Sequence, residues 1–140
     1  MQTGDVLDMM GGLVAQLKHY AAKLPPVVHL AVVPTGVKPK FEAVEEYEEI
    51  VSRFRSQSAG TPYKGLNGLF VESLEAFEVG GLLGAVHPLL SVLDHIERMQ
   101  RDKEIQIGRP DEKRTAEYRS ALNKILPGNK PELDGSGRGI

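Results

Sequence analysis

Large apolar side chains are most concentrated between Leu66 and Met99, and this run is interrupted in only two places. The pair Gly80-Gly81 interrupts it first, and Pro88 interrupts it second. Glycine and proline are the residues that most often end or bend a helix. We therefore expect a helix over about 66–79, a second helix that continues to about residue 103, and a short connection between them. This hairpin is expected to be the centre around which the rest of the chain packs.

Pro88 leaves two positions open for the start of the second helix. Proline is well suited to the first position of a helix, where its missing N–H group is not needed. Alternatively, the helix runs continuously from Leu82 and is kinked at Pro88. In that case Gly84, four residues before the proline, would reduce the crowding between the ring and the preceding turn.

The first helix is expected from about Gly4 to Leu24, with Thr3 as its N-cap. Its apolar positions are spaced alternately by four and three residues, which is typical of a helix with one apolar seam. Gly11-Gly12 in the middle of this helix costs about 1 kcal/mol per glycine relative to alanine. The pair is either a weak point or a place where another helix approaches closely. The seam consists of Val6, Met10, Leu13, Leu17, Tyr20 and Leu24, with Leu7, Val14 and Ala21 beside it.

A strand is predicted directly after the Pro25-Pro26 pair that ends the first helix. Residues 27–33 read Val-Val-His-Leu-Ala-Val-Val and are bounded by prolines, a pattern typical of a covered strand. A strand needs a partner for its backbone hydrogen bonds. Residues 104–107, which alternate polar and apolar, are a weak candidate within the chain. The other alternative is a strand from another chain.

The remaining pattern predicts two more helices, a linker and a tail. One helix is expected over about 41–57, with five glutamates in its first half, and a linker over 56–65 follows it. The last helix is expected over 111–126. The predicted fold class is therefore mainly α: a small helical bundle of about five helices with one short strand or a minimal two-stranded sheet. Residues 1–128 are expected to form a single domain, and 129–140 a flexible C-terminal tail.

Composition narrows the class of protein without defining its function. The chain has 140 residues, a formal net charge of −2 and no cysteine, so disulfides and thiol chemistry are excluded. The longest uncharged stretch, 79–93, is too short and too broken by glycine and proline to cross a bilayer core of about 30 Å. Asp5 and Asp8 near the N-terminus are untypical of a secretory signal. We expect a cytoplasmic protein that makes no membrane contact.

Candidate chemistry is weak wherever it occurs. Thr35, Gly36, Lys38 and Lys40 between the expected strand and the next helix suggest an anion site. However, no phosphate-loop sequence is present, and the five glutamates that follow would repel an anion.

A second candidate is the helical face that carries His87, Ser91 and His95. The two histidines are roughly 12 Å apart along a helix axis and cannot share one metal ion without further ligands. We expect no catalytic residues, no cofactor and no metal.

The segment 98–124 carries eight basic and five acidic residues, a local charge of +3. Nucleic-acid-binding surfaces have such an excess, and so do many solvated helix pairs. This segment supports the alternative function, a small nucleic-acid-associated protein. The residues proposed for that role are Arg98, Arg101, Lys103, Arg109, Lys113, Arg114 and Arg119.

The predicted function is a non-enzymatic protein–protein interaction or assembly subunit, such as an adaptor or scaffold component. Its partner is expected to be another protein, a further copy of the same chain, or both. The evidence is the wide apolar seam of the first helix and the strand without a convincing mate. The predicted partner-binding residues are Val6, Met10, Leu13, Val14, Leu17, Tyr20, Val28, Leu30 and Val32.

Overall fold

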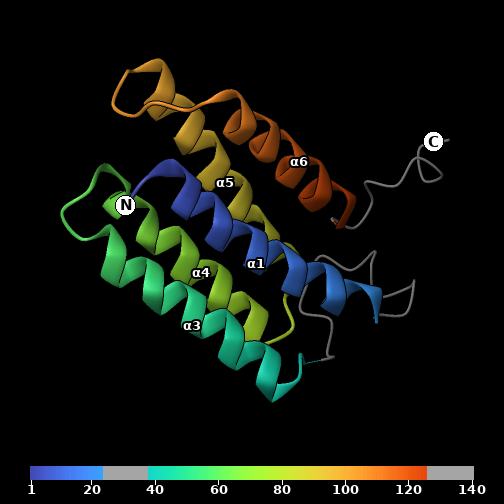
Figure 1. The fold of residues 1–140 in the computed structure, drawn as a ribbon. Coiled ribbons are helices and arrows are strands. Elements are labelled where there is room, and N and C mark those ends of the chain that lie inside the picture. Colours follow the sequence, from blue (N-terminus) through green and yellow to red (C-terminus); the bar gives the residue numbers. More distant parts are fainter. Residues whose placement is uncertain (24–37, 126–140) are drawn as a thin grey trace, which may run out of the picture.

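The computed structural model describes residues 1–23 and 38–125. Within these residues it contains five α-helices and one short 3₁₀ helix, and no strand (Figure 1). The prediction of a mainly helical bundle is confirmed. The elements are α1 (Thr3–Ala22), α3 (Phe41–Ser58), η1 (Pro62–Leu66), α4 (Asn67–Glu78), α5 (Leu82–Arg101) and α6 (Arg109–Ile125).

The five helices close into a ring around one apolar core. Along the ring, α1 packs beside α3, α3 beside α4, α4 beside α5, α5 beside α6, and α6 beside α1 again. Helix α1 also reaches α5 across the ring, and α4 and α5 form the most extensive pair (Figure 1). The expected central hairpin is therefore present, and α1 closes the bundle in front of it.

The turn between α4 and α5 explains why the hairpin breaks at Gly80-Gly81. Gly80 has a φ of +77°, a conformation that L-residues with a Cβ rarely adopt. Its N–H donates to the Phe77 carbonyl at 3.0 Å, and the Gly81 N–H donates to the Ala76 carbonyl at 2.8 Å. These two bonds form a Schellman motif, which caps the last carbonyls of α4.

Helix α5 runs without interruption through Pro88, so the continuous alternative is the one that the structure shows. Pro88 is buried and has no N–H to donate to the carbonyl of Gly84. Gly84 also allows close packing, because an added Cβ there would lie 3.0 Å from the Cβ of Ala76 on α4. Gly84 therefore leaves room for the ring of Pro88 and also lets α4 pack closely against α5.

The glycine pair of α1 lies where two other helices come close, as one of the two hypotheses for it predicted. A Cβ added to Gly11 would lie 2.5 Å from the Tyr118 hydroxyl of α6, and one added to Gly12 would lie 2.9 Å from Ile50 Cδ1 of α3. The missing side chains thus let α1 sit between α6 and α3. The small size of glycine offsets its poor helix propensity at this crossing.

The N-terminus of α1 differs in detail from the prediction. Gln2, and not Thr3, is the N-cap, and the Gln2 N–H donates to Asp5 Oδ2 at 2.8 Å. Thr3 is the first helical residue, and its buried hydroxyl forms a hydrogen bond with the hydroxyl of Tyr63 in η1. Thr3 therefore ties α1 to the connection between α3 and α4.

A buried chain of hydrogen bonds links α3, α4 and α5. The Ser73 hydroxyl donates to the Ala85 carbonyl at 2.6 Å, so the Tyr47 hydroxyl donates its proton to Ser73 Oγ, also at 2.6 Å. The Tyr47 ring stacks on Phe77 with ring centroids 4.5 Å apart. Burial raises the pKa of Tyr47 well above its ordinary value, against the smaller opposing effect of the Ser73 hydrogen bond.

Two predicted irregular segments need correction. Residues 104–107 are not a strand: they form the irregular connection between α5 and α6, and Ile105 and Ile107 pack partly against the core. The predicted linker 56–65 is largely helical, because α3 continues to Ser58 and η1 begins at Pro62. The predicted strand 27–33 and tail 129–140 lie outside the described residues.

None of the described helices is long and apolar enough to cross a membrane.

Candidate functional site

The residues predicted to bind a partner on α1 are inside the bundle. Val6, Met10, Leu13 and Leu17 have no exposed surface, and Val14 is 4% exposed. The chain's own helices α3, α5 and α6 cover them, so a partner cannot reach them in the folded chain. The heptad-type spacing correctly indicated an apolar face, but the covering helices come from the same chain. Val28, Leu30 and Val32 lie outside the described residues.

Two large apolar side chains are left exposed in the described part of the chain. Phe41 is 70% exposed and Val79 is 51% exposed. Phe41 begins α3 and Val79 follows α4, so both lie at the same end of this antiparallel helix pair (Figure 1). We call this pair of side chains the Phe41–Val79 surface.

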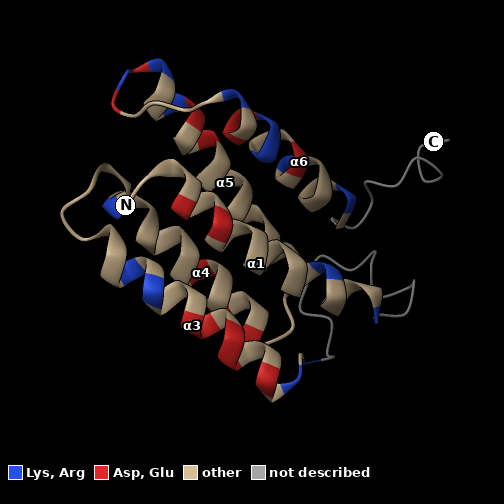
Figure 2. Cartoon of the chain, viewed as in Figure 1, with Lys and Arg blue, Asp and Glu red and all other residues tan. Residues whose placement is uncertain are grey.

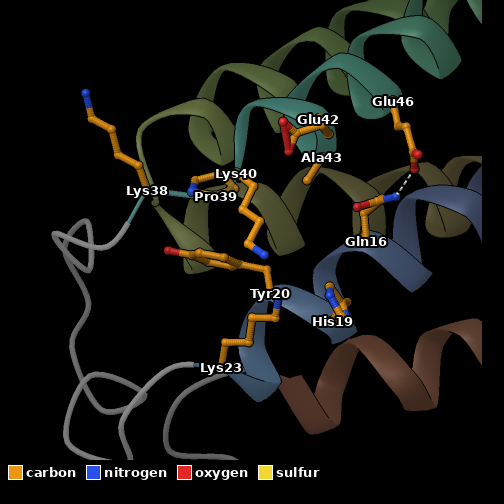
Figure 3. Close-up of a pocket in the computed structure, with 10 residues that line it drawn as sticks. All are labelled: Gln16, His19, Tyr20, Lys23, Lys38, Pro39, Lys40, Glu42, Ala43 and Glu46. Atoms are coloured by element: carbon orange, nitrogen blue, oxygen red, sulfur yellow. Dashed lines mark hydrogen bonds between the residues drawn. The ribbon is translucent and has the colours of Figure 1, made fainter.

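A cavity of about 440 Å³ opens between the last turns of α1 and the first turns of α3 (Figure 3), and Lys40 and Glu42, which flank Phe41 in the sequence, line it. Its volume is in the range of small binding sites. Tyr20 connects it to the neighbouring turn, because the Tyr20 hydroxyl donates to the Gly80 carbonyl at 3.2 Å. We call it the α1–α3 cavity. It is lined by Gln16, His19, Tyr20, Lys23, Lys38, Pro39, Lys40, Glu42, Ala43 and Glu46.

The α1–α3 cavity combines apolar walls with mixed charges. Figure 3 shows Lys40 reaching from the start of α3 into the space between the two helices, whereas Lys38 points away from it. Among the described residues, neither of these lysines nor Lys23 forms an ion pair. Glu46 is already engaged, since its Oε2 accepts a hydrogen bond from Gln16 Nε2 at 2.5 Å. The cationic groups of the cavity therefore have unused hydrogen-bond donors.

An acidic surface adjoins this cavity. Five glutamates in the first half of α3 are exposed, and Figure 2 shows acidic residues gathered on this part of the helix. Such a run lowers the local potential and disfavours a polyanion close to it. The five residues are Glu42, Glu45, Glu46, Glu48 and Glu49.

Two of the seven residues proposed for nucleic-acid binding have a structural role instead. Arg119 of α6 pairs with Asp94 at 2.8 Å and Glu97 at 3.0 Å, both on α5. Arg114 of α6 pairs with Asp8 of α1 at 2.5 Å. These ion pairs attach α6 to its two neighbouring helices.

The two arginines also have raised pKa values. For Arg114 the main cause is the hydrogen bond to the Tyr118 hydroxyl. For Arg119, partial burial lowers the pKa, but the hydrogen bonds and charges of Asp94 and Glu97 outweigh that effect. Both side chains therefore stay charged over any ordinary pH range.

The other five candidate basic residues remain on the surface. They gather around the end of α5 and the start of α6 (Figure 2), and none of them forms an ion pair within the described residues. Asp102, Glu104 and Glu112 are exposed among them and reduce the local positive charge. The five are Arg98, Arg101, Lys103, Arg109 and Lys113.

The described residues contain no group of three or more His, Asp or Glu side chains placed to hold a metal ion. The helical face with His87 and His95 is intact because α5 is continuous. Its acidic neighbours Asp94 and Glu97 are paired with Arg119. Asp94 and Glu97 therefore serve the contact with α6.

No protein-family model, no curated protein and no solved structure matches this chain. Function must therefore be argued from the site and not from the fold.

The sequence pattern did not identify the Phe41–Val79 surface or the α1–α3 cavity. Phe41 continues the apolar face of α3 in the sequence, and only the position of α4 shows that this first residue projects beyond the core. The one available signal was the cluster of Lys38 and Lys40 before a helix, which the pattern associated with an anion.

Proposed function

We propose that this chain is a non-enzymatic protein-interaction subunit that contacts its partner through the Phe41–Val79 surface. The observation that carries the proposal is the exposure of these two side chains, whereas the other large apolar side chains of the described residues are covered or partly covered. Exposed large apolar side chains that are rimmed by polar residues are typical of protein contact sites. The rim is supplied here by the lysines and glutamates of the α1–α3 cavity.

The gain from covering this surface is substantial for so small a patch. Burial of a Phe or Val side chain contributes roughly 1.5–3 kcal/mol when the exposed state is the reference. Interfaces commonly depend on a few such central side chains, with polar contacts around them. Phe41 and Val79 are therefore expected to be the energetic centre of the contact.

The proposal is tested by reconstitution with a purified partner. Proteins captured by the full chain from its native source, together with the chain itself, are purified and tested for binding by native mass and calorimetry. The double variant Phe41→Ser/Val79→Ser should weaken the reconstituted complex at least tenfold, as expected for two central contacts. The matched control, Lys64→Ser/Gln106→Ser, changes two exposed side chains on η1 and the α5–α6 connection and should have no effect.

Two results would overturn the proposal. One is equal affinity of wild type and the Phe41→Ser/Val79→Ser variant for every reconstituted partner. The other is a wild-type chain that stays monomeric and for which no captured protein binds after purification.

The alternative proposal, nucleic-acid association, is supported by the five exposed basic side chains around the α5–α6 connection. Such binding would act through phosphates, so its affinity should fall steeply with salt concentration. Fluorescence anisotropy with a single-stranded and a duplex oligonucleotide at about 50 mM salt measures it. Absence of binding at that salt concentration would remove this alternative.

A further inference from the structure

We infer that the α1–α3 cavity receives a carboxylate side chain of the partner, so that the partner segment combines an apolar anchor with flanking Asp or Glu residues. The inference rests on the proposed function, because the anchor would cover the Phe41–Val79 surface. It adds the chemistry of the partner and assigns the cavity a role in recognising it.

The cavity and the Phe41–Val79 surface are close to one another along the chain. Lys40 directly precedes Phe41, and Tyr20, which lines the cavity, donates a hydrogen bond to the carbonyl of Gly80, the residue after Val79. A single extended segment of a partner can therefore touch both. Its apolar residue would meet Phe41 and Val79, and a neighbouring side chain would enter the cavity.

The lysine ammonium groups of the cavity favour an acidic side chain of the partner. The ammonium group of Lys40 lies between α1 and α3 (Figure 3), and Lys23 adds a second positive charge at the end of α1. Neither has a carboxylate partner among the described residues. A lysine ammonium group binds a carboxylate through a charge-assisted hydrogen bond, which is stronger than a bond between neutral groups.

The surrounding charges limit the size of the anion. Glu42 and Glu46 line the same cavity, and Glu45, Glu48 and Glu49 continue the acidic surface along α3. A nucleic acid would bring many phosphates against these glutamates and be repelled. A single carboxylate in a peptide matches the excess charge of the cavity, whose lining has one more lysine than glutamate, without meeting the rest of α3.

The expected contribution of each lysine is modest. Lys23 and Lys40 are exposed, and ion pairs at exposed positions typically change an equilibrium constant by a factor of about 1.4 to 5. The combined effect of two such pairs is a factor of about 2 to 25, and it should weaken as salt screens the charges.

The experiment uses the full chain and three defined probes followed by two-dimensional amide NMR. The first is a blocked peptide of about eight residues with Phe and Leu flanked by Asp and Glu. The second is the same peptide with Asn and Gln in place of the acids. The third is a single-stranded oligonucleotide of about twelve nucleotides.

We expect the acidic peptide to bind more tightly than its amide counterpart and to shift the amide signals of Gln16, Lys40 and Ala43. Lys40→Gln should weaken it by a factor of about 1.4 to 5, and Lys23→Gln/Lys40→Gln by a factor of about 2 to 25. The matched control Lys64→Gln removes the same charge from η1 and should leave the affinity unchanged. Circular dichroism checks that each variant keeps its helices.

The outcomes separate this inference from the proposed function. Equal binding of the two peptides that still depends on Phe41 would overturn the carboxylate assignment and leave the interaction surface intact. Binding of the oligonucleotide at the cavity, or no shift with the acidic peptide, would also overturn the assignment. The proposed function itself fails only if the Phe41→Ser/Val79→Ser variant binds every reconstituted partner as wild type does, or if no purified partner binds.

Discussion

The apolar stripe of α1 and the Phe41–Val79 surface differ in exposure, although both consist of apolar positions in or next to amphipathic helices. The stripe is wide and regularly spaced, and the chain's own α3, α5 and α6 cover it completely. Phe41 stands at the first position of a helix with a shorter apolar face, and it is 70% exposed. The more conspicuous pattern in the sequence belongs to the core, and the less conspicuous one to the candidate contact site.

The difference has a simple physical cause. Helix α1 contacts α3 and α6 as its neighbours in the ring and α5 across it, so its position requires a wide apolar face. Phe41 stands at the first position of α3, and the described residues of its own chain leave its side chain largely uncovered. The wide apolar stripe of α1 is therefore explained by the number of helices that cover it, and it does not indicate a partner.

The largest expected effect comes from placing the same charge in each region. Val14→Glu buries a carboxylate among apolar side chains and should cost about 3–5 kcal/mol of unfolding free energy. Phe41→Glu adds the same group at an exposed position and should stay within about 0.5 kcal/mol of wild type. Urea unfolding followed by circular dichroism measures both. A folded, stable Val14→Glu variant would show that the flank of the α1 stripe is not core.

The glycine pair of α1 tests how closely that helix is enclosed. An added methyl group at Gly11 meets the rigid Tyr118 ring, with Cζ at 3.2 Å, whereas at Gly12 it meets the flexible end of Ile50. Gly11→Ala should therefore cost about 1–3 kcal/mol by overpacking. Gly12→Ala gains up to about 1 kcal/mol of helix propensity and should end near wild type. Thermal unfolding of the two variants measures the difference, and a Gly11→Ala variant as stable as Gly12→Ala would contradict the close crossing.

The hydrogen bond of Tyr47 gives a second test of the buried core. Tyr47→Phe removes its bond to Ser73 and should cost about 0.5–1.5 kcal/mol at neutral pH. Because the pKa of Tyr47 is raised in the folded chain, the unfolded chain loses this proton first as the pH increases. Wild-type stability should thus fall by up to about 1.4 kcal/mol per pH unit above pH ~10, and be unaffected by this group below it.

The measurement for Tyr47 is the urea midpoint between pH 7 and 11. The Tyr47→Phe variant should lose less stability than wild type above pH ~10, since it has no proton to lose at this position. Equal alkaline slopes for the two chains would show that the Tyr47 hydroxyl is not buried as described.

The smallest effect concerns the turns at the two ends of α5. Both α4 and α5 are followed by a residue with positive φ, which is Gly80 after α4 and Lys103, at +61°, after α5. A side chain in this conformation costs about 1–2 kcal/mol, partly offset by the greater freedom of glycine in the unfolded chain. Lys103→Gly should therefore stabilise the chain by about 0.5–1 kcal/mol, and Gly80→Ala should destabilise it by at least as much. Calorimetric melting temperatures measure both, and a destabilised Lys103→Gly variant would mean that the lysine side chain itself supports the turn.

The sequence alone was sufficient for local features. Periodic apolar positions and the glycine and proline breaks placed the helices within a few residues, and the break at Gly80-Gly81 is confirmed in detail. These features depend on nearest neighbours along the chain: helix propensity, the left-handed conformation that glycine adopts, and the missing N–H of proline. The continuous path of α5 through Pro88 was one of two alternatives, because the choice depends on how α4 packs beside Gly84.

Only the tertiary structure decided which apolar face is covered by which helix. Val14 and Phe41 are both apolar residues in helices, and nothing in their local sequence distinguishes a buried from an exposed position. The distinction arises because α3, α5 and α6, distant in sequence, close around α1, while α3 begins at the end of the ring beyond its neighbours. The α1–α3 cavity likewise exists only where the last turns of one helix meet the first turns of another. Burial depends on contacts between segments that are far apart in the chain. A periodic pattern predicts an apolar face, but it does not indicate which segment covers that face.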